Sequence, residues 1–280
     1  MRLVILGAIM AAVLGACATA PVVPVAPVEQ GAKVSRSNEY MLKSKGNGQD
    51  YVVLVSAPIE PLPAGEKAPV IYVMDGNWYF GMATDVVRML AIGQEMGPAY
   101  IVAIAYSDPT FTKVVERRET DLVHKAFNGP AGMMGGGGEA FLSFLTDEVR
   151  PFVEARFPVD SGRSVLAGQS LGGLFATNVL LSKPDSFYGY LIGSPSLWAD
   201  ASLLEQSKHF AAGGGHAVYV GVGGGESPMM RNMTKKLAEA LLASSTGLRA
   251  DYAELARHSH SSMHGAWFTA GLAYLLPKAE

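Results

Sequence analysis

The sequence predicts an α/β fold with a mostly parallel central sheet, an antiparallel hairpin at its N-terminal edge and helices on both faces. The first observation is composition: of 280 residues, 49% are apolar and 17% charged, which is typical of a folded chain. The second is that short continuous apolar runs alternate with longer amphipathic stretches, as in βα units. The third is length, since a chain of this size often forms one such domain.

The strands are predicted from apolar runs bounded by turn residues. Two β-like runs, residues 38–44 and 51–56, are separated by Lys45-Gly46-Asn47-Gly48, a strong hairpin signal. The later runs are continuous and apolar, like parallel strands that helices cover on both faces. They are residues 69–74, 100–106, 164–168, 188–192 and 217–222, followed by a last strand at 251–256.

Amphipathic stretches between these runs predict the helices. They lie at residues 79–90, 139–156, 171–181, 230–243 and 265–276. Residues 107–138 are left as one long loop, charged in its middle and ending in the four glycines 135–138. A loop of that length beside a compact core is usually functional or mobile.

The N-terminus has the pattern of an export signal. Residues 1–16 carry one positive charge, Arg2, followed by an apolar run too short to anchor stably in a bilayer. Residues 14–17 resemble the bacterial lipobox, which predicts a lipidated Cys17; the alternative is an ordinary signal peptide with a chance cysteine. Residues 17–34 are then a lipidated, Pro-rich tether and 35–280 a single catalytic domain. No Asp follows Cys17 closely, so we expect a cell-envelope protein, anchored by lipid in the outer membrane and facing the periplasm.

Charge and cysteine content exclude several kinds of protein. The formal net charge of −3 gives no electrostatic basis for nucleic-acid binding, which needs clustered Lys and Arg. Cys17 is the single cysteine, so the chain has no internal disulfide, Cys-based metal cluster or CxxC redox pair.

A candidate nucleophile stands in Gly168-Gln169-Ser170-Leu171-Gly172, which matches G-x-S-x-G between a predicted strand and a predicted helix. The glycines permit a sharp turn that lifts the serine hydroxyl clear of the sheet, while the helix N-terminus favours developing negative charge. The alternative is a glycine-rich turn with an exposed serine.

The partners of such a serine follow along the chain, first an acid and then a histidine. Glu226 is the candidate acid because it directly follows the strand at 217–222; Asp185 and Asp200 are the competitors, in polar segments. Three histidines, His258, His260 and His264, lie between the last strand and the last helix, and periodicity does not separate them. The remaining histidines, at 124, 209 and 216, precede the acid in the chain and are therefore excluded as candidates for the base.

Together these residues resemble the putative-esterase family of α/β-hydrolases, and most closely its periplasmic siderophore-esterase-like branch. The resemblance extends from about residue 38 to the C-terminus. It rests on the segments 70–77 (VIYVMDGN), 117–121 (RRETD), 147–152 (DEVRPF), 168–173 (GQSLGG), 194–198 (SPSLW) and 224–226 (GGE). It implies the α/β-hydrolase fold and a serine esterase.

The resemblance also assigns individual residues. The family's base stands eleven residues before a glycine of the final helix, which here is Gly271 and selects His260, with His264 second. The family's oxyanion hole maps onto the amides of Leu171 and Asn77; the alternative for Asn77 is a plain turn.

Other assignments stay open. The segment after Asp121 departs from the family pattern, so the substrate loop is not transferable. Arg117 and Arg118 are candidates for binding an anionic or catecholate substrate, or else form a surface ion pair. Residues 194–198 are expected to shape the floor of the site near the nucleophile, with Trp198 a candidate for substrate binding; the alternative for Trp198 is packing in the core. The methionine pairs 133–134 and 229–230 line an apolar cleft or fill the core.

The sequence thus predicts a serine esterase that acts on carboxylic esters, with siderophore lactones and thioesters among the candidates. Ser170 attacks, His260 transfers the proton, Glu226 orients the imidazole, and an acyl-enzyme forms. No metal or organic cofactor is expected, the partner is a small-molecule ester, and the oligomeric state is not predicted. The alternatives are an acyltransferase with the same triad and a non-catalytic binding lipoprotein of hydrolase fold.

Overall fold

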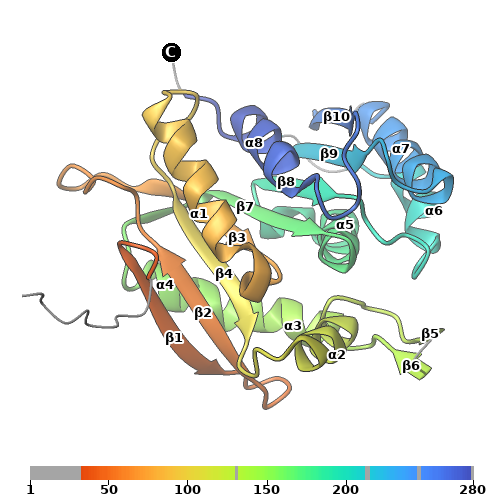
Figure 1. The fold of residues 1–280 in the computed structure, drawn as a ribbon, viewed down its shortest axis with the longest axis horizontal. Helices are drawn as coiled ribbons and strands as arrows, with labels where there is room; N and C mark the ends of the chain where they lie inside the picture. The colour runs from red at the N-terminus through yellow and green to blue at the C-terminus, as the bar shows by residue number, and fades with distance from the viewer. Residues whose placement is uncertain (1–32, 130–131, 212–214, 245–246, 279–280) are drawn as a thin grey trace, which may run out of the picture. The chain divides into compact units, whose positions relative to one another are not determined.

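The computed structural model describes residues 33–129, 132–211, 215–244 and 247–278. Within these residues, eight strands form one sheet in the order β1-β2-β4-β3-β7-β8-β9-β10 (Figure 1). The strands are β1 (Ser37–Lys43), β2 (Asp50–Ser56), β3 (Ala68–Val73), β4 (Tyr100–Tyr106), β7 (Val159–Gln169), β8 (Gly189–Gly193), β9 (Ala217–Gly223) and β10 (Arg249–Leu255). The predicted signal peptide, Cys17 and nearly all of the predicted tether lie outside the described residues.

The direction of the strands confirms the predicted fold class. β1 pairs antiparallel with β2, and β2 pairs antiparallel with β4, whereas every pair from β4 to β10 is parallel. All residues of β3, β4, β8 and β9 are buried, because helices cover both faces of the sheet.

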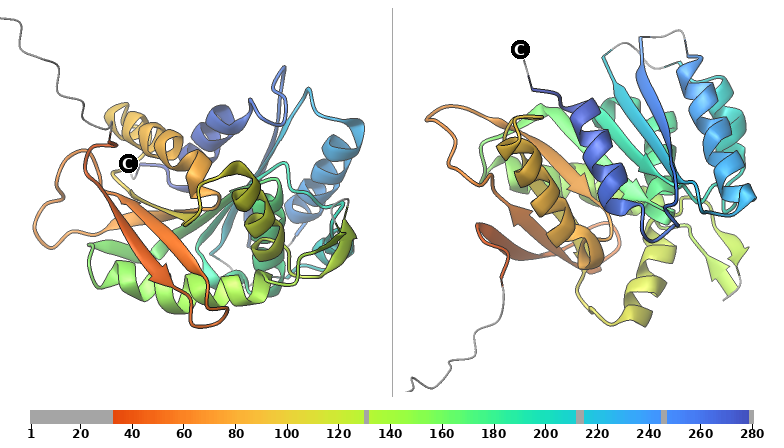
Figure 2. Two further views of the ribbon diagram at one scale, coloured as in Figure 1. Left: turned by 60° about the horizontal axis from the view of Figure 1, so that its bottom comes forward. Right: turned by 45° about the horizontal axis from the view of Figure 1, so that its top comes forward.

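The helices lie in two layers. On one face, α1 (Gly76–Ile92) and α8 (His264–Leu275) lie side by side (Figures 1 and 2). On the other, α5 (Leu171–Ser182) packs on β7 and β8, and α7 (Pro228–Leu242) on β9 and β10. Alternate residues of β3 divide between two apolar cores, Ile71 and Val73 toward α1 and α8, Val70 and Tyr72 toward the opposite layer. A short helix that the sequence pattern does not reveal, α6 (Ser202–Lys208), packs against α7.

The prediction of one long loop at residues 107–138 is wrong. The segment contains α2 (Phe111–Asp121) and a small hairpin of β5 (Phe127–Gly129) and β6 (Gly132–Met134), which lie at the lower right of Figure 1. Only Val114 and Asp121 of α2 are buried, so the helix has almost no apolar stripe for periodicity to reveal.

The predicted helix at 139–156 is interrupted in its hydrogen bonding. It consists of α3 (Gly138–Ser143), a π-helical turn η1 (Phe144–Val149) and α4 (Arg150–Glu154). Pro151 has no N–H to donate to the carbonyl four residues earlier, and its ring crowds that carbonyl. The wider turn before it accommodates this defect.

No helix among the described residues combines the length and apolar character needed to cross a membrane. Because β3, β7, β8 and β9 are parallel, the loops that follow them meet at the carboxyl ends of the strands. Ser170, Ser194 and Glu226 lie in the turns and loops after β7, β8 and β9, and Asn77 lies in the first turn of α1, which follows β3.

Candidate active site

Ser170 occupies a sharp turn between the end of β7 at Gln169 and the start of α5 at Leu171. Its backbone has φ 61° and ψ −119°, a strained conformation for a residue with a side chain. A Cβ atom on Gly168 would lie 2.2 Å from the carbonyl oxygen of Gly172, so this turn closes only with glycine there. The G-x-S-x-G pattern therefore has the strand-turn-helix context that it requires.

The loop after β8 packs against this turn. Ser196 N donates a hydrogen bond to Ser170 O at 3.0 Å, and Ser170 N donates to Gly193 O at 2.9 Å. The two hydroxyl groups, Ser170 Oγ and Ser196 Oγ, are 3.2 Å apart. Ser170 therefore hydrogen-bonds through its side chain to Ser196, and not to an imidazole, among the described residues.

Glu226 and His260 are in direct contact. The Nδ1–H of His260 donates to Glu226 Oε2 at 2.7 Å, and the Glu226 side chain is 2% exposed. Ser194 Oγ donates to the other carboxylate oxygen, as does the Gly223 N–H at 3.0 Å. Burial on its own would raise the pKa of Glu226, but the hydrogen bonds from His260, Ser194 and Gly223 outweigh burial and lower it. The carboxylate is thus held ionised behind the imidazole.

The competing acids lie in other contacts. Asp185 pairs with His216 at 3.0 Å, and Asp200 pairs with Lys125 at 3.2 Å. Neither aspartate lines the pocket that contains Ser170.

The three clustered histidines have distinct partners. His258 Nδ1 donates to Ser262 O at 3.0 Å, and His264 Nδ1 donates to Ser261 O at 2.8 Å. The His264 ring lies 4.4 Å from the Tyr79 ring, and burial lowers the pKa of His264. His260 is the one of the three that contacts Glu226, and Gln169 Nε2 donates to its carbonyl oxygen at 3.1 Å.

The amides of Leu171 and Asn77 lie in the first turns of α5 and α1. Backbone N–H groups in a first turn have no partner within their own helix, and these two N–H groups donate to no other backbone carbonyl among the described residues. The Asn77 side chain is fixed to the backbone of Tyr106, accepting from its N–H at 2.8 Å and donating to its carbonyl at 3.1 Å. A Cβ atom on Gly172 would lie 3.2 Å from Met74 Cβ, so the loop after β3 packs on the start of α5.

A pocket of about 510 Å³ opens beside these groups. Trp198 lies in its wall with 42% of its surface exposed, and its ring contacts the edge of Phe127 at a centroid distance of 6.0 Å. Trp198 is therefore not a core residue. The full lining is Ser170, Ser196, Trp198, Gly225, Glu226, Ser227, Met229, Met230, Ser259 and His260, which includes no Lys or Arg. The other methionine pair is in β6.

Arg117 and Arg118 do not line this pocket. Arg117 Nη2 pairs with Asp121 Oδ2 at 2.9 Å and also donates to the Tyr51 hydroxyl at 3.0 Å. Arg118 makes two hydrogen bonds of 2.9 Å to the two oxygens of Asp75, with 12% of its side chain exposed. A substrate-binding role for either arginine stays a prediction, but the Arg118 ion pair is internal, not on the surface.

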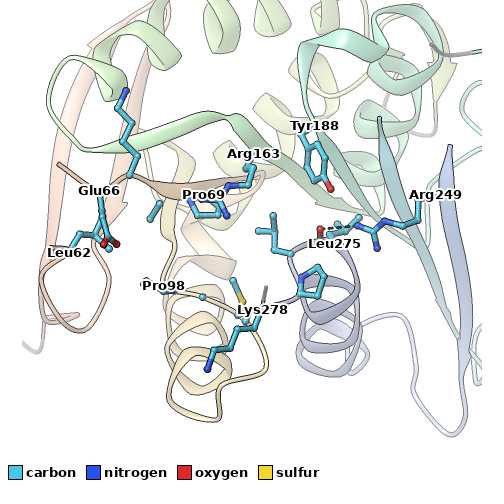
Figure 3. A pocket seen from close by; sticks show the side chains of 15 residues that line it. Leu62, Glu66, Pro69, Pro98, Arg163, Tyr188, Arg249, Leu275 and Lys278 are labelled. Atoms are coloured by element: carbon cyan, nitrogen blue, oxygen red, sulfur yellow. Dashed lines mark hydrogen bonds between the residues drawn. The ribbon is translucent and has the colours of Figure 1, made fainter. Parts of the chain in front are cut away.

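A second and larger pocket, of about 650 Å³, lies at the opposite end of the sheet, toward the amino ends of the parallel strands (Figure 3). Pro69, Tyr188 and Arg249, at or next to the starts of parallel strands, contribute to its lining, as does Arg163 in the first half of β7. It contains none of the predicted site residues, so its size does not identify the active site.

Among the residues that the structure describes, no group of three or more His, Cys, Asp or Glu side chains is arranged to hold a metal ion. The prediction that the reaction needs no cofactor is not tested by this observation.

The sequence pattern indicates Ser170, Glu226 and His260, but not the contacts that fix them. Gln169 is one of the two variable positions of G-x-S-x-G, and Ser194 lies in the segment expected at the floor of the site, where the serine itself is given no contact. Both act on residues distant in sequence, Gln169 on His260 and Ser194 on Glu226. No local pattern encodes such contacts.

Comparison with known proteins places this geometry in a family. Over 242 residues the chain is 30% identical to the ferri-bacillibactin esterase BesA of Bacillus subtilis, covering 80% of this chain and 83% of that protein. It is 36% identical over 180 residues to the siderophore triacetylfusarinine C esterase of Aspergillus fumigatus, covering 62% and 61%. The crystal structure of the BES protein from Bacillus cereus superposes with a TM-score of 0.81 at 28% identity, covering 90% of this chain and 99% of that one. Residues 44–275 match the model of the putative esterase family, so the chain belongs to that family and is an esterase-type hydrolase with an α/β-hydrolase fold.

Proposed function

We propose that this protein is a serine esterase that cleaves ester bonds of siderophores through a covalent acyl-enzyme. The observation that carries the proposal is the 2.7 Å contact between His260 Nδ1 and the buried carboxylate of Glu226, at a pocket that Ser170 also lines. A hydroxyl, an imidazole and a carboxylate at one pocket are the groups that nucleophilic acyl transfer requires.

In the first half-reaction, Ser170 Oγ adds to the ester carbonyl carbon while His260 Nε2 accepts the hydroxyl proton. Glu226 stabilises the imidazolium that forms. The carbonyl oxygen becomes an oxyanion that accepts hydrogen bonds from the amides of Leu171 and Asn77. The tetrahedral intermediate then collapses, the ester C–O bond breaks, and His260 returns its proton to the leaving alkoxide.

In the second half-reaction, water adds to the acyl carbon and gives its proton to His260. Collapse of this second intermediate breaks the bond to Ser170 Oγ, which regains the proton, and the free acid leaves. For the first step the Ser170 hydroxyl turns from Ser196, where it lies at 3.2 Å, toward His260. Catalytic hydrogen bonds commonly tighten in this way only when substrate binds.

The proposal of a siderophore substrate draws on the relatives. The bacterial relative is named for ferri-bacillibactin and the fungal relative for triacetylfusarinine C. The pocket supports a large ester, since Trp198, Met229 and Met230 offer a broad apolar wall and methionine adapts to irregular shapes.

Covalent labelling tests the nucleophile. A fluorophosphonate probe should add to the wild type at Ser170, with the mass of the tryptic peptide identifying the site, and should not label Ser170→Ala. Ser196→Ala is the matched control because it removes the neighbouring hydroxyl and leaves the nucleophile. A folded wild type that is not labelled, or a Ser170→Ala variant that is, contradicts the proposal. Incubation with siderophore triesters, followed by mass spectrometry of the products, then tests the substrate class.

A further inference from the structure

The ion pair between Arg118 and Asp75 lies beside the two turns that carry the proposed oxyanion donors. Asp75 precedes Gly76-Asn77, and its side chain is 0% exposed. Its Oδ2 atom is 3.4 Å from where a Cβ atom of Gly172 would lie, so it also packs against the first turn of α5, which carries Leu171. One buried carboxylate therefore borders both loops that supply the N–H groups.

Asp75 also fixes the path of the chain at this point. Its φ of 57° is in the left-handed region, which is unfavourable for a residue with a side chain. Its carbonyl oxygen accepts from Trp78 N at 2.9 Å and from Tyr79 N at 3.2 Å, which begins α1. The two hydrogen bonds from the planar Arg118 guanidinium hold the side chain of this strained residue in one orientation.

Charge gives the pair a second effect. An unpaired carboxylate in this place would oppose the negative charge that develops on the substrate oxygen, because a buried charge is poorly screened. Arg118 neutralises the carboxylate, and its guanidinium also lies 5.3 Å from the Trp78 ring centroid. The guanidinium edge that faces Asp75, formed by Nε and Nη2, is occupied by the two carboxylate oxygens, so the geometry does not present that edge to a substrate anion.

We infer that Arg118 is a positioning residue for the oxyanion hole and is not a ligand for an anionic substrate. The inference rests on the proposed function. Arg118 holds Asp75, Asp75 holds the turn that presents the Asn77 amide, and the pair keeps the oxyanion site free of net negative charge.

The test compares Arg118→Ala, Asp75→Asn and the double variant, with a neutral p-nitrophenyl ester and an anionic ester as substrates. We expect Arg118→Ala to lower kcat about tenfold or more for both esters, with KM changed less than about twofold, as when an oxyanion contact is weakened. The double variant should recover much of that kcat, because it no longer leaves a charged carboxylate unpaired. Lys113→Ala, which removes an exposed charge from the same helix, is the control.

Three results would overturn the inference. A rise in KM confined to the anionic ester, with normal kinetics on the neutral ester, means that Arg118 binds the substrate. A lower Tm with unchanged kcat means that the pair only stabilises the fold. A double variant whose kcat is no higher than that of Arg118→Ala means that the unpaired carboxylate does not cause the loss. Arg118→Lys, which keeps the charge and loses the planar guanidinium, replaces Arg118→Ala in this comparison if the alanine variant does not fold. Failure of the proposed function itself is recognised separately, since Ser170→Ala would then keep its activity.

Discussion

Ser194 shows how one buried hydroxyl can hold the acid of the candidate triad. Its side chain is inaccessible to solvent, its φ is 36°, and its Oγ donates to Glu226 Oε1 and lies 2.8 Å from Met263 Sδ. Ser194→Ala should lower the free energy of unfolding by about 1–3 kcal/mol, because it leaves a buried acceptor with one partner fewer.

The activity of Ser194→Ala separates positioning from packing. We expect kcat to fall while KM changes little, measured by steady-state kinetics beside urea unfolding. Ser207→Ala, which removes an equally buried hydroxyl that donates to Leu204 O on α6, should lose stability and keep kcat. Equal kcat in the two variants would refute a positioning role for Ser194.

Glu226 links stability to pH. Its native pKa is below the ordinary value of 4.5, so as pH falls the unfolded chain takes up this proton before the folded chain does. Its contribution to stability is complete above about pH 4.5 and is lost as pH falls through the native pKa. In urea unfolding from pH 6 downward, the stability difference between wild type and Glu226→Gln should shrink on the acid side. A constant difference would mean that the pKa is not lowered.

At the scale of single residues, the sequence identifies candidate catalytic residues better than it identifies the residues that contact them. Glu226 is found because a buried strand and three glycines place it at a strand end. His260 and His264 are not distinguished by periodicity, since His260 lies in a loop and His264 is the first residue of α8, where no repeating face has yet begun. Only the fold brings Gln169, Ser194 and the loop of His260 to one place, so those contacts could not be predicted.

Among the elements, the turn from β7 to α5 depends most on its glycines. Gly168→Ala should cost about 1–3 kcal/mol or more, because the new methyl would overlap the Gly172 carbonyl and the backbone must shift. Gly81→Ala in α1 is the matched control, with open space around the new methyl and a gain of about 1 kcal/mol expected from helix propensity. Thermal unfolding of both variants checks this; equal effects would contradict the account of the turn.

The predicted and observed elements differ where burial is small or a proline intervenes. The apolar runs of β3, β4 and β9 are confirmed because continuous burial leaves a clear pattern. α2 is not predicted because it buries two residues, and the π-helical turn before Pro151 is not predicted because apolar spacing does not report hydrogen-bond register. Element type is thus predictable where a face is buried.

The N-terminus of the described chain and the candidate site lie at opposite ends of the strands. Ser37, where β1 begins, pairs with Ser56, which pairs with Ile101 near the start of β4. The described chain therefore enters at the amino ends of the parallel strands, whereas Ser170 and Glu226 follow carboxyl ends. Cys17, whose lipidation the sequence predicts, lies outside the described residues.

The anchor is tested by Cys17→Ser. Labelled palmitate should enter the wild type and not the variant, and the variant should either remain an unprocessed precursor or be released as a soluble protein with unchanged kcat/KM. One acyl chain binds membranes only marginally, so stable fractionation with membranes requires the multiply acylated cysteine. A wild type that takes up no palmitate, beside a variant that still sediments with membranes, would contradict the lipobox prediction.

The central claim is that Ser170, His260 and Glu226 act as one catalytic unit, and non-additivity of rates tests it most directly. We would measure turnover of one siderophore ester by Ser170→Ala, His260→Ala and the double variant, with His264→Ala, at the first residue of α8, as the control. Turnover by each single variant should fall by several orders of magnitude, and the double variant should be little slower, because removing either residue already disables the unit. His264→Ala should keep most of its activity. Losses that multiply in the double variant, or a collapse at His264→Ala with His260→Ala still active, would contradict the account.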